Sequence, residues 1–231
     1  ALLEQIKAEK ARLVKDKKIK KENPLPPITP EEIPYELPEG WVWCRMQNLV
    51  SLLGDGIHGT PEYSINSEYY FVNGNNLTDG VIEIKSNTKT VTEKEYIKHR
   101  RNLNENTILI SINGTIGNTA FYNDEKVMLG KSACYFNLIN GIDKYFIRQL
   151  LKSNYFLNYA FSSATGTTIK NVSLKTVRSF IVPLPSVHEQ KAIVETVNRL
   201  MALCDQLEEE VLQSEKQVEL MMKGVLREVL G

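Results

Sequence analysis

The chain has 231 residues, of which 42% are hydrophobic and 24% are charged, and its 28 basic and 28 acidic side chains give a formal net charge of zero. This composition is typical of a globular protein and excludes disordered and fibrous classes, so we expect one domain with appendages. The sequence contains neither an apolar run long enough to predict a membrane span nor a signal-peptide pattern.

The cysteines argue against a disulfide framework and against a zinc site. Cys44, Cys134 and Cys204 are far apart and none belongs to a C-x-x-C pair. A reducing, cytoplasmic location is therefore expected. Because the chain opens at Ala1 inside a charged helical pattern, we also expect it to be a fragment or a trimmed form of a longer protein.

Residues 1–21 are predicted to be mainly helical. Apolar residues recur near helical spacing between Leu2 and Val14, and no glycine or proline occurs before Pro24. The segment carries eight basic and three acidic residues, whereas residues 187–231 carry five basic and nine acidic ones. The two ends can therefore attract each other, within one chain or between two chains. A solvated, fraying helix and a packed helix both fit the pattern.

Residues 22–40 are predicted to be an extended connector. Six prolines fall between Asn23 and Pro38. Such a segment is semi-rigid, and we expect it to make few core contacts and to let the first helix point away from the domain that begins at Trp41.

Residues 41–185 are predicted to form an α+β domain with a mixed, curved sheet. Short apolar runs are separated by Gly, Asn, Asp and Ser, which favours strands joined by turns. Helices are expected at about 144–161 and 92–98. The candidate strands are Gln47–Leu53, Tyr69–Val72, Val81–Ile84, Thr107–Ser111, Ile116–Tyr122, Val127–Leu129, Ala133–Leu138 and Ser179–Val182.

Polar loops and a basic segment of this domain are the candidate binding elements. The loops 54–63, 111–117 and 165–170 combine hydroxyls and amides with glycines, and residues 85–101 are rich in Lys and Arg. Such groups suit base edges and phosphates, although glycine-rich loops are also ordinary turns and charge runs are often solvated faces. The candidate DNA-binding residues are His58, Thr60, Tyr63, Lys85, Lys89, Lys98, Arg100, Arg101, Asn113, Thr115, Thr167 and Lys170.

The sequence offers no catalytic or metal-binding constellation. The three histidines do not share metal-ligand spacing, and nucleophile-elbow, phosphate-loop and dinucleotide-binding motifs are absent. We therefore expect a non-enzymatic chain without metal or cofactor.

Residues 186–231 are predicted to form one long helix that begins at about Val187. Ser186 and Glu189 have the spacing of a capping box, and apolar residues then recur in alternating steps of four and three, broken only at Ser214. The pattern favours a coiled coil over a helix packed on its own domain, and it predicts self-association with Cys204 buried. The seam residues are Ile193, Val197, Leu200, Cys204, Leu207, Val211, Val218, Met221 and Val225.

Taken together, several stretches resemble the specificity (S) subunit of type I restriction-modification systems. Their order and spacing cover nearly the whole chain and resemble the second half of that family. The stretches are Leu2–Lys21 followed by Leu37–Trp43, Asp55–Pro61, Leu109–Gly117, Thr165–Ile169, and Ile181–Pro185 with His188–Gln190.

The resemblance implies a division of labour. Residues 1–21 would end a central conserved spacer helix, residues 41–185 would be one target recognition domain, and residues 186–231 would be the distal conserved helix. The domain would read half of a split site in double-stranded DNA through the major groove. Methylase (M) subunits would grip the helices and carry the chemistry, and the restriction (R) subunit would join indirectly.

Family members carry two recognition domains, whereas this chain has one. The resemblance therefore implies a C-terminal fragment or a half-length subunit that pairs with another. The alternative, from a different class of protein, is a coiled-coil adaptor whose central domain binds a protein or peptide. Absence of DNA binding at low salt would favour the adaptor.

Overall fold

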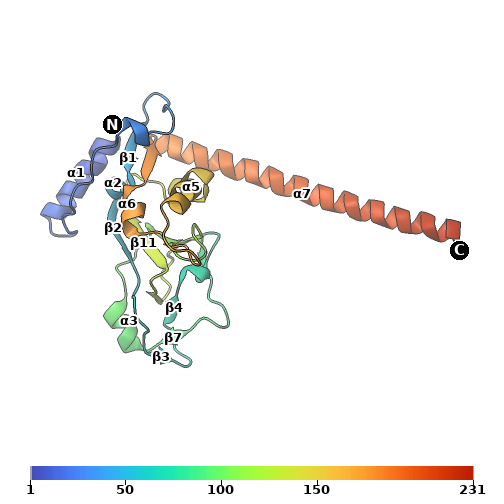
Figure 1. Cartoon of the computed structure of the whole chain (residues 1–231), viewed down its shortest axis with the longest axis horizontal. Helices are drawn as coiled ribbons and strands as arrows, with labels where there is room; N and C mark the ends of the chain where they lie inside the picture. Colours follow the sequence, from blue (N-terminus) through green and yellow to red (C-terminus); the bar gives the residue numbers. More distant parts are fainter. Residues whose placement is uncertain (1, 231) are drawn as a thin grey trace. The chain divides into compact units, whose positions relative to one another are not determined.

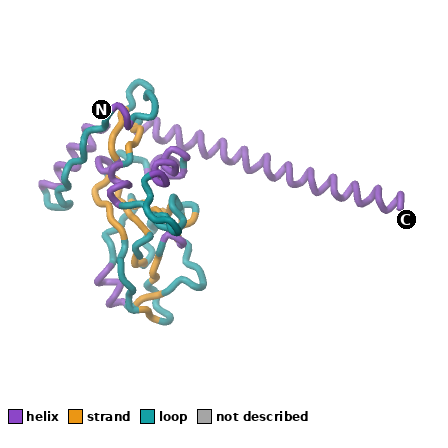
Figure 2. The backbone as a smooth tube through the Cα atoms, viewed as in Figure 1, coloured by secondary structure: helices purple, strands orange, loops and turns teal. Residues whose placement is uncertain are grey.

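The computed structural model describes residues 2–230, which fall into two compact units, one ending at Gln190 and the other starting at Lys191. The first unit combines helices with several small sheets (Figure 1), and long loops join them (Figure 2). The predicted α+β class is confirmed.

The first helix, α1, spans Leu2–Lys15 and is shorter than predicted. Lys17 adopts a left-handed conformation (φ 57°), the amide of Lys18 donates to the carbonyl of Leu13, and the amide of Lys17 donates to that of Val14. These bonds form a Schellman cap, which ends a helix without requiring glycine when another residue tolerates the conformation. Ile6 is only 1% exposed, so α1 packs on the unit and is not a solvated helix.

The expectation that residues 22–40 make few contacts is wrong. The guanidinium of Arg45 donates to the carbonyls of Pro26 and Pro27 and forms a two-point ion pair with Glu32, with N–O distances of 2.9 Å. The ring of Tyr35 packs edge-on against Trp43 at 5.2 Å. The prolines keep the backbone extended, as predicted, but the segment is attached to the domain along its length.

The chain enters and leaves the domain through one pair of strands. Strand β1 (Val42–Arg45) pairs antiparallel with β12 (Ile181–Leu184), and Arg45 also donates to the carbonyl of Ser179. The region predicted as a strand from Gln47 begins instead with the short helix α2 (Met46–Leu49). The backbone amide of Arg45 donates to the side chain of Asn48, which favours this turn over an extended start.

Within residues 2–190, two four-stranded sheets and a small hairpin form the body. One sheet has the order β2-β11-β8-β9 and is antiparallel; the other has the order β10-β4-β7-β3 and pairs β10 with β4 in parallel. The second sheet is therefore mixed, as predicted, because β4 and β3 both pair antiparallel with β7. The bounds are β2 Val50–Asp55, β3 Tyr63–Ser64, β4 Tyr70–Val72, β5 Leu77–Thr78, β6 Val81–Ile82, β7 Thr90–Val91, β8 Thr107–Ser111, β9 Thr119–Phe121, β10 Val127–Leu129 and β11 Ala133–Leu138.

These sheets share one apolar core. Val72 of β4, Leu109 of β8 and Leu129 of β10 belong to one buried cluster with Leu77 of the β5–β6 hairpin. Burial of such side chains stabilises the fold by roughly 25 cal/mol per Å² of apolar surface. The core therefore fixes the strands from which the polar loops emerge.

Several short helices border the sheets. Helix α3 spans Glu93–His99, close to its prediction. The helix predicted over 144–161 is divided at Ser153, whose hydroxyl caps the second half by accepting from the amide of Phe156. The bounds are η1 Pro30–Glu32, η2 Gly74–Asn76, α4 Lys144–Lys152, α5 Asn154–Ser162 and α6 Leu174–Ser179.

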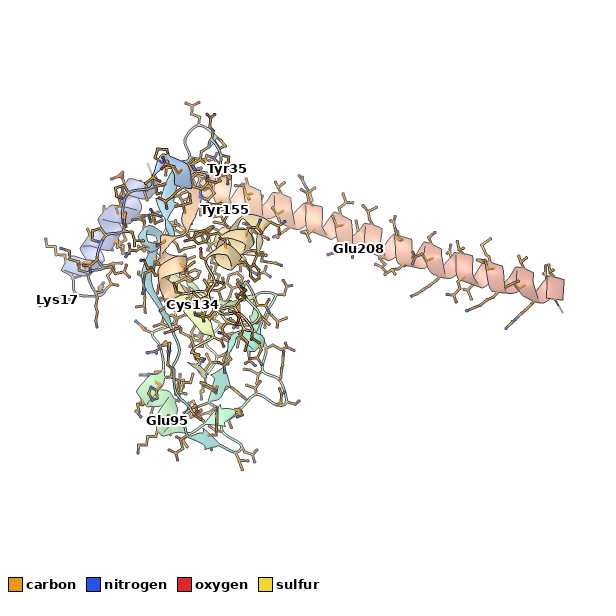
Figure 3. The ribbon with its side chains drawn as sticks, in the orientation of Figure 1. Lys17, Tyr35, Glu95, Cys134, Tyr155 and Glu208 are labelled. Atoms are coloured by element: carbon orange, nitrogen blue, oxygen red, sulfur yellow. The ribbon has the colours of Figure 1, made fainter. Side chains whose placement is uncertain are left out.

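The long helix α7 spans Val187–Leu230, as the sequence predicts. Its capping box is present, because the hydroxyl of Ser186 accepts from the amide of Glu189 and the Glu189 carboxylate accepts from the amide of Ser186. From Leu200 onward the seam leucines, valines and methionine are more than half exposed, and Cys204, expected to be buried, is exposed in the single chain. Glu208 marks this part of α7 in Figure 3.

Candidate nucleic-acid interface

Helix α3 and strands β3 and β7 lie at one end of the first unit, and α1 and β1 lie at the other (Figure 1). Glu95 of α3 marks the first end in Figure 3, whereas Tyr35 and Tyr155 mark the second. The two ends differ in whether they contain the predicted DNA-binding side chains. At the α3 end, two concave surfaces contain half of the predicted DNA-binding residues.

The first of these surfaces, here called the loop groove, has a volume of about 590 Å³ and lies between residues 55–62 and the last turn of α3. It brings together four predicted residues that are about forty positions apart in the sequence. Its lining includes the predicted His58, Thr60, Lys98 and Arg101 together with Asp55, Glu62, Glu95 and His99.

The loop groove carries charges of both signs. The imidazole Nε2 of His58 lies 2.6 Å from a carboxylate oxygen of Asp55, and Lys98 lies 3.5 Å from Glu95. His99 is also 3.8 Å from Glu95. Because acids accompany the cations, the groove is suited to a polar ligand of defined shape rather than to any polyanion.

One wall of the loop groove depends on a glycine. A Cβ atom at Gly56 would lie 1.9 Å from the carbonyl oxygen of Leu129, so only glycine permits this close approach. The next amide, that of Ile57, donates to the same carbonyl at 2.8 Å. The loop that carries His58 and Thr60 is thereby held against strand β10.

The other wall is helix α3, which is fixed at its start and along its side. The hydroxyl of Thr92 caps it by accepting from the amide of Glu95 at 3.2 Å, and Tyr96 stacks on Tyr69 with ring centroids 4.5 Å apart. The Tyr69 phenol donates a hydrogen bond to Glu93 at 3.1 Å, and desolvation together with this bond raises the pKa of the phenol. The helix therefore presents its last turn from a fixed position.

Two arginines follow this turn. Arg100 is the C-cap residue of α3, and its side chain is exposed. The Nε atom of Arg101 is buried, yet it has no hydrogen-bond partner among the described residues. A buried unpaired donor costs roughly 1–3 kcal/mol. Arg101 also belongs to the lining of the loop groove.

The second surface, here called the amide hollow, has a volume of about 220 Å³. It contains the predicted residues Tyr63 and Lys89, whose ammonium lies 4.3 Å from the Tyr63 ring centroid. Lys85 lies at its border, where its ammonium donates to the backbone carbonyl of Asn75 and pairs with Glu83. The other residues that line the hollow are Phe71, Asn73, Asn75, Asn76, Asn87 and Thr88.

These asparagines are not among the residues that the sequence predicts. The signal was present, because three of the four residues from Asn73 to Asn76 are asparagines in a turn between two predicted strands. Amides carry both a donor and an acceptor, which makes them suitable for reading base edges. The run contains one glycine and no charged residue, so neither glycine content nor basic charge distinguishes it from an ordinary turn.

The other two predicted loops form a separate cluster. Asn113 and Asn171 form a backbone bridge, and the Asn113 amide donates to the Asn171 side chain at 3.2 Å. The hydroxyl of Thr115 donates to the carbonyl of Gly74, whereas Thr167 and Lys170 are exposed. The structure thus joins these loops to each other and, through Thr115, to the turn that carries Asn75.

A further concavity of the first unit lies elsewhere. It measures about 830 Å³, lies between residues 18–22 and strands β2 and β11, and contains none of the predicted DNA-binding residues. In the part of the chain that the structure describes, no group of three or more His, Cys, Asp or Glu residues is placed to bind a metal ion. Across the same residues, no helix combines the length and apolarity required to span a bilayer.

Comparison with known proteins gives a consistent set of matches. Residues 53–216 match the family described as type I restriction modification DNA specificity domain. The chain is 31% identical to the type I restriction enzyme EcoAI specificity subunit and 28% identical to the EcoEI specificity subunit, both of Escherichia coli. Each match covers 97% of this chain and 39% of the relative, so the chain spans well under half the length of these proteins.

Solved structures show the same fold. The HsdS subunit from Thermoanaerobacter tengcongensis matches 87% of this chain and 47% of its own, with 15% identity and a TM-score of 0.54. A structure described as the basis of complex assembly and conformational transition of the type I R-M system matches 94% of this chain and 52% of its own, with 15% identity and a TM-score of 0.56.

Proposed function

The chain belongs to the type I restriction-modification DNA specificity family, and on this premise we propose that it recognises one half of a split site in double-stranded DNA. Methylation and cleavage are then the work of partner subunits, and this chain requires no cofactor. In this proposal the M subunits dock on its helices, the R subunit joins through them, and the complex is cytoplasmic.

The loop groove is the observation that carries this proposal. It places the imidazole of His58, the hydroxyl of Thr60 and the guanidinium of Arg101 around one concave surface. Arg101 lines this groove, and a guanidinium is suited to bind a DNA phosphate or a guanine edge. Acidic residues in the groove limit binding to DNA that fits, which is what a recognition subunit requires.

The boundaries of the parts are also proposals. Residues 41–185 form the target recognition domain, and residues 1–21 and 186–231 are the conserved helices that set spacing and bind M subunits. The connector, residues 22–40, belongs functionally with the recognition domain, because Arg45 binds its carbonyls and Glu32. An exchange of recognition domains between relatives therefore needs to carry the connector with it.

The test is the salt dependence of DNA binding. Because each neutralised phosphate releases counterions, the slope of log K against log salt reflects the number of contacts. Replacement of Lys98, Arg100 and Arg101 with Ala should reduce the slope by about one per lost phosphate contact. Fluorescence anisotropy with a labelled duplex at several salt concentrations measures it.

A matched control distinguishes the contribution of the loop groove to DNA binding from the effect of positive charge elsewhere on the protein. Lys15, Lys20 and Lys21 are also exposed, but they belong to α1 and the segment that follows it and do not line the loop groove. Their replacement with Ala removes the same charge and should leave the slope nearly unchanged. Equal slopes for the two triple variants would show that binding does not use the loop groove, and no binding at low salt would favour the adaptor function.

A further inference from the structure

Two exposed asparagines of the amide hollow have side chains that the fold does not use. Asn75 lies in η2, and Asn87 lies in the turn between Lys85 and Thr88, where the amide of Thr88 donates to the carbonyl of Lys85 at 2.9 Å. Neither side-chain amide makes a hydrogen bond to another described residue. Both line the same hollow.

A buried asparagine fixes the two turns to each other. Asn76 is 5% exposed, and its amide nitrogen donates to the carbonyl of Glu83 and to the hydroxyl of Thr88, each at 3.1 Å. Its side-chain oxygen accepts from the amide of Asn73 at 3.1 Å. Because this buried amide is bonded at both ends, the turns that carry Asn75 and Asn87 keep a defined separation.

The turn of Asn75 is also anchored to the core strands. The amide of Gly74 donates to the hydroxyl of Ser132 at 2.9 Å, and its carbonyl accepts from the hydroxyl of Thr115. A Cβ atom at Gly74 would lie 2.1 Å from the hydroxyl oxygen of Ser111, so the contact requires glycine. The amide of Asn75 is thus presented by rigid backbone, as specific recognition requires.

Other residues of the amide hollow can bind the phosphates that lie next to a base edge. The Lys89 ammonium lies over the Tyr63 ring and provides a positive charge at one side. Tyr63 is three residues from Thr60 of the loop groove, a span of at most about 10 Å along extended chain. Phosphate contacts in the loop groove and base contacts in the amide hollow are therefore within reach of one DNA segment.

We propose that Asn75 and Asn87 are specificity-determining residues that read base edges in the major groove of DNA, each through its side-chain amide. An asparagine amide matches the adenine edge, where it donates to N7 and accepts from the N6 amino group. The proposal rests on the proposed function and deepens it, because it separates residues that read bases from residues that hold phosphates.

The test compares sequence preference with affinity. Wild-type chain, Asn75→Ala and Asn87→Ala are each used to select from a duplex library with randomised positions, at one salt concentration. Each Ala variant should lose discrimination at one adenine by about 5–150-fold while the salt slope stays unchanged. Asn75→Asp and Asn87→Asp should move the preference at the same positions toward cytosine, whose amino group donates to a carboxylate.

The matched control uses asparagines outside the hollow. Asn123 and Asn158 are also exposed, and their replacement with Ala should leave the selected sequence unchanged. If wild type selects a half-site and the Asn75 and Asn87 variants select the same one at every position, the inference is overturned while the proposed function stands. If wild type selects no sequence, both fail.

Discussion

The two units of the chain use apolar side chains in opposite ways. In the first unit Val72, Leu109 and Leu129 are at most 1% exposed, because strands from separate sheets close around them. In α7 beyond Lys191, Leu207 and Val218 are each 52% exposed although they stand at heptad core positions. A single helix satisfies its backbone hydrogen bonds alone, but it cannot bury a stripe along its own surface.

This difference in burial shows where each unit obtains its stability. The first unit obtains it internally, since the buried amide of Asn76, the guanidinium of Arg45 and the apolar core all have partners within residues 2–190. The long helix carries an apolar seam that it cannot cover by itself. Substitutions should therefore alter folding in the first unit and assembly in the second.

The largest expected effect is on folding and concerns Arg45. Its side chain is 9% exposed and donates to four different residues, so Arg45→Ala removes all of these hydrogen bonds together with the packing of a buried side chain. The free energy of unfolding should fall by about 3 kcal/mol, because several hydrogen bonds from a charged donor are lost together. Urea unfolding monitored by tryptophan fluorescence measures it.

The control for this prediction is Arg12→Ala, which breaks an exposed ion pair with Glu9 in α1. That change should remain within about 0.5 kcal/mol of wild type. Equal effects of the two variants would show that the connector is not fixed by Arg45.

The next effect is on assembly and concerns Cys204. Cys204→Asp places a charge at a seam position, which should weaken helix pairing by several kcal/mol while the first unit keeps its unfolding midpoint. Sedimentation measurements at tens of micromolar, with and without an M subunit, give the association constant. Gln206→Asp on the same helix, outside the seam, is the control.

Thiol labelling gives an independent measurement of the same seam. Cys204 is exposed in the single chain, so it should react rapidly at low concentration and more slowly as the protein associates. Cys44 and Cys134 are buried, and burial raises the pKa of both thiols, that of Cys44 to about 12, so they should stay unreactive. A strictly monomeric wild-type chain with constant labelling rate would contradict the seam.

The smallest expected effect is the pH dependence of the Glu32 contribution. Hydrogen bonding from Arg45 and from the Thr29 amide holds the pKa of the Glu32 carboxyl below its usual value. A depressed pKa in the folded state means that this contribution is present above the unfolded pKa of about 4.3 and is lost as pH falls through the folded value. The stability difference between wild type and Glu32→Gln should therefore be constant near neutral pH and narrow below about pH 4.

Urea midpoints of both proteins between about pH 3 and 7 test this dependence. A difference that persists unchanged at the acid end would mean that Glu32 acts only through packing. The exposed Glu36, replaced with Gln, supplies the reference for general effects of charge.

Helices and strands whose sequence pattern lies within a few neighbouring residues were predictable. Strands β8, β10 and β11 lie at the predicted residues because each is a short apolar run between turn residues. The start of α7 followed from the Ser186 and Glu189 spacing, since both halves of a capping box lie within one turn. The end of α1 was missed because its cap uses Lys17 rather than glycine.

The candidate interface was only partly predictable, because concave surfaces arise from residues distant in sequence. The loop and charge patterns identified His58 and Arg101, but only the fold places both in one groove. The hydrogen bonds distinguish Asn75 and Asn87 from Asn76. The side chain of Asn76 bonds to other residues of the domain, whereas the side chains of Asn75 and Asn87 do not.

The sequence by itself determined the class of the fold, the family resemblance, and the capped long helix with its seam, because periodicity, capping and motif order depend on near neighbours along the chain. Only the tertiary structure decided that residues 22–40 are bound by Arg45 and which polar side chains are left free at the α3 end. The reason is physical, because a donor finds its hydrogen-bond acceptors only when folding brings them close. One acceptor of Arg45, the carbonyl of Ser179, lies 134 positions away in the sequence.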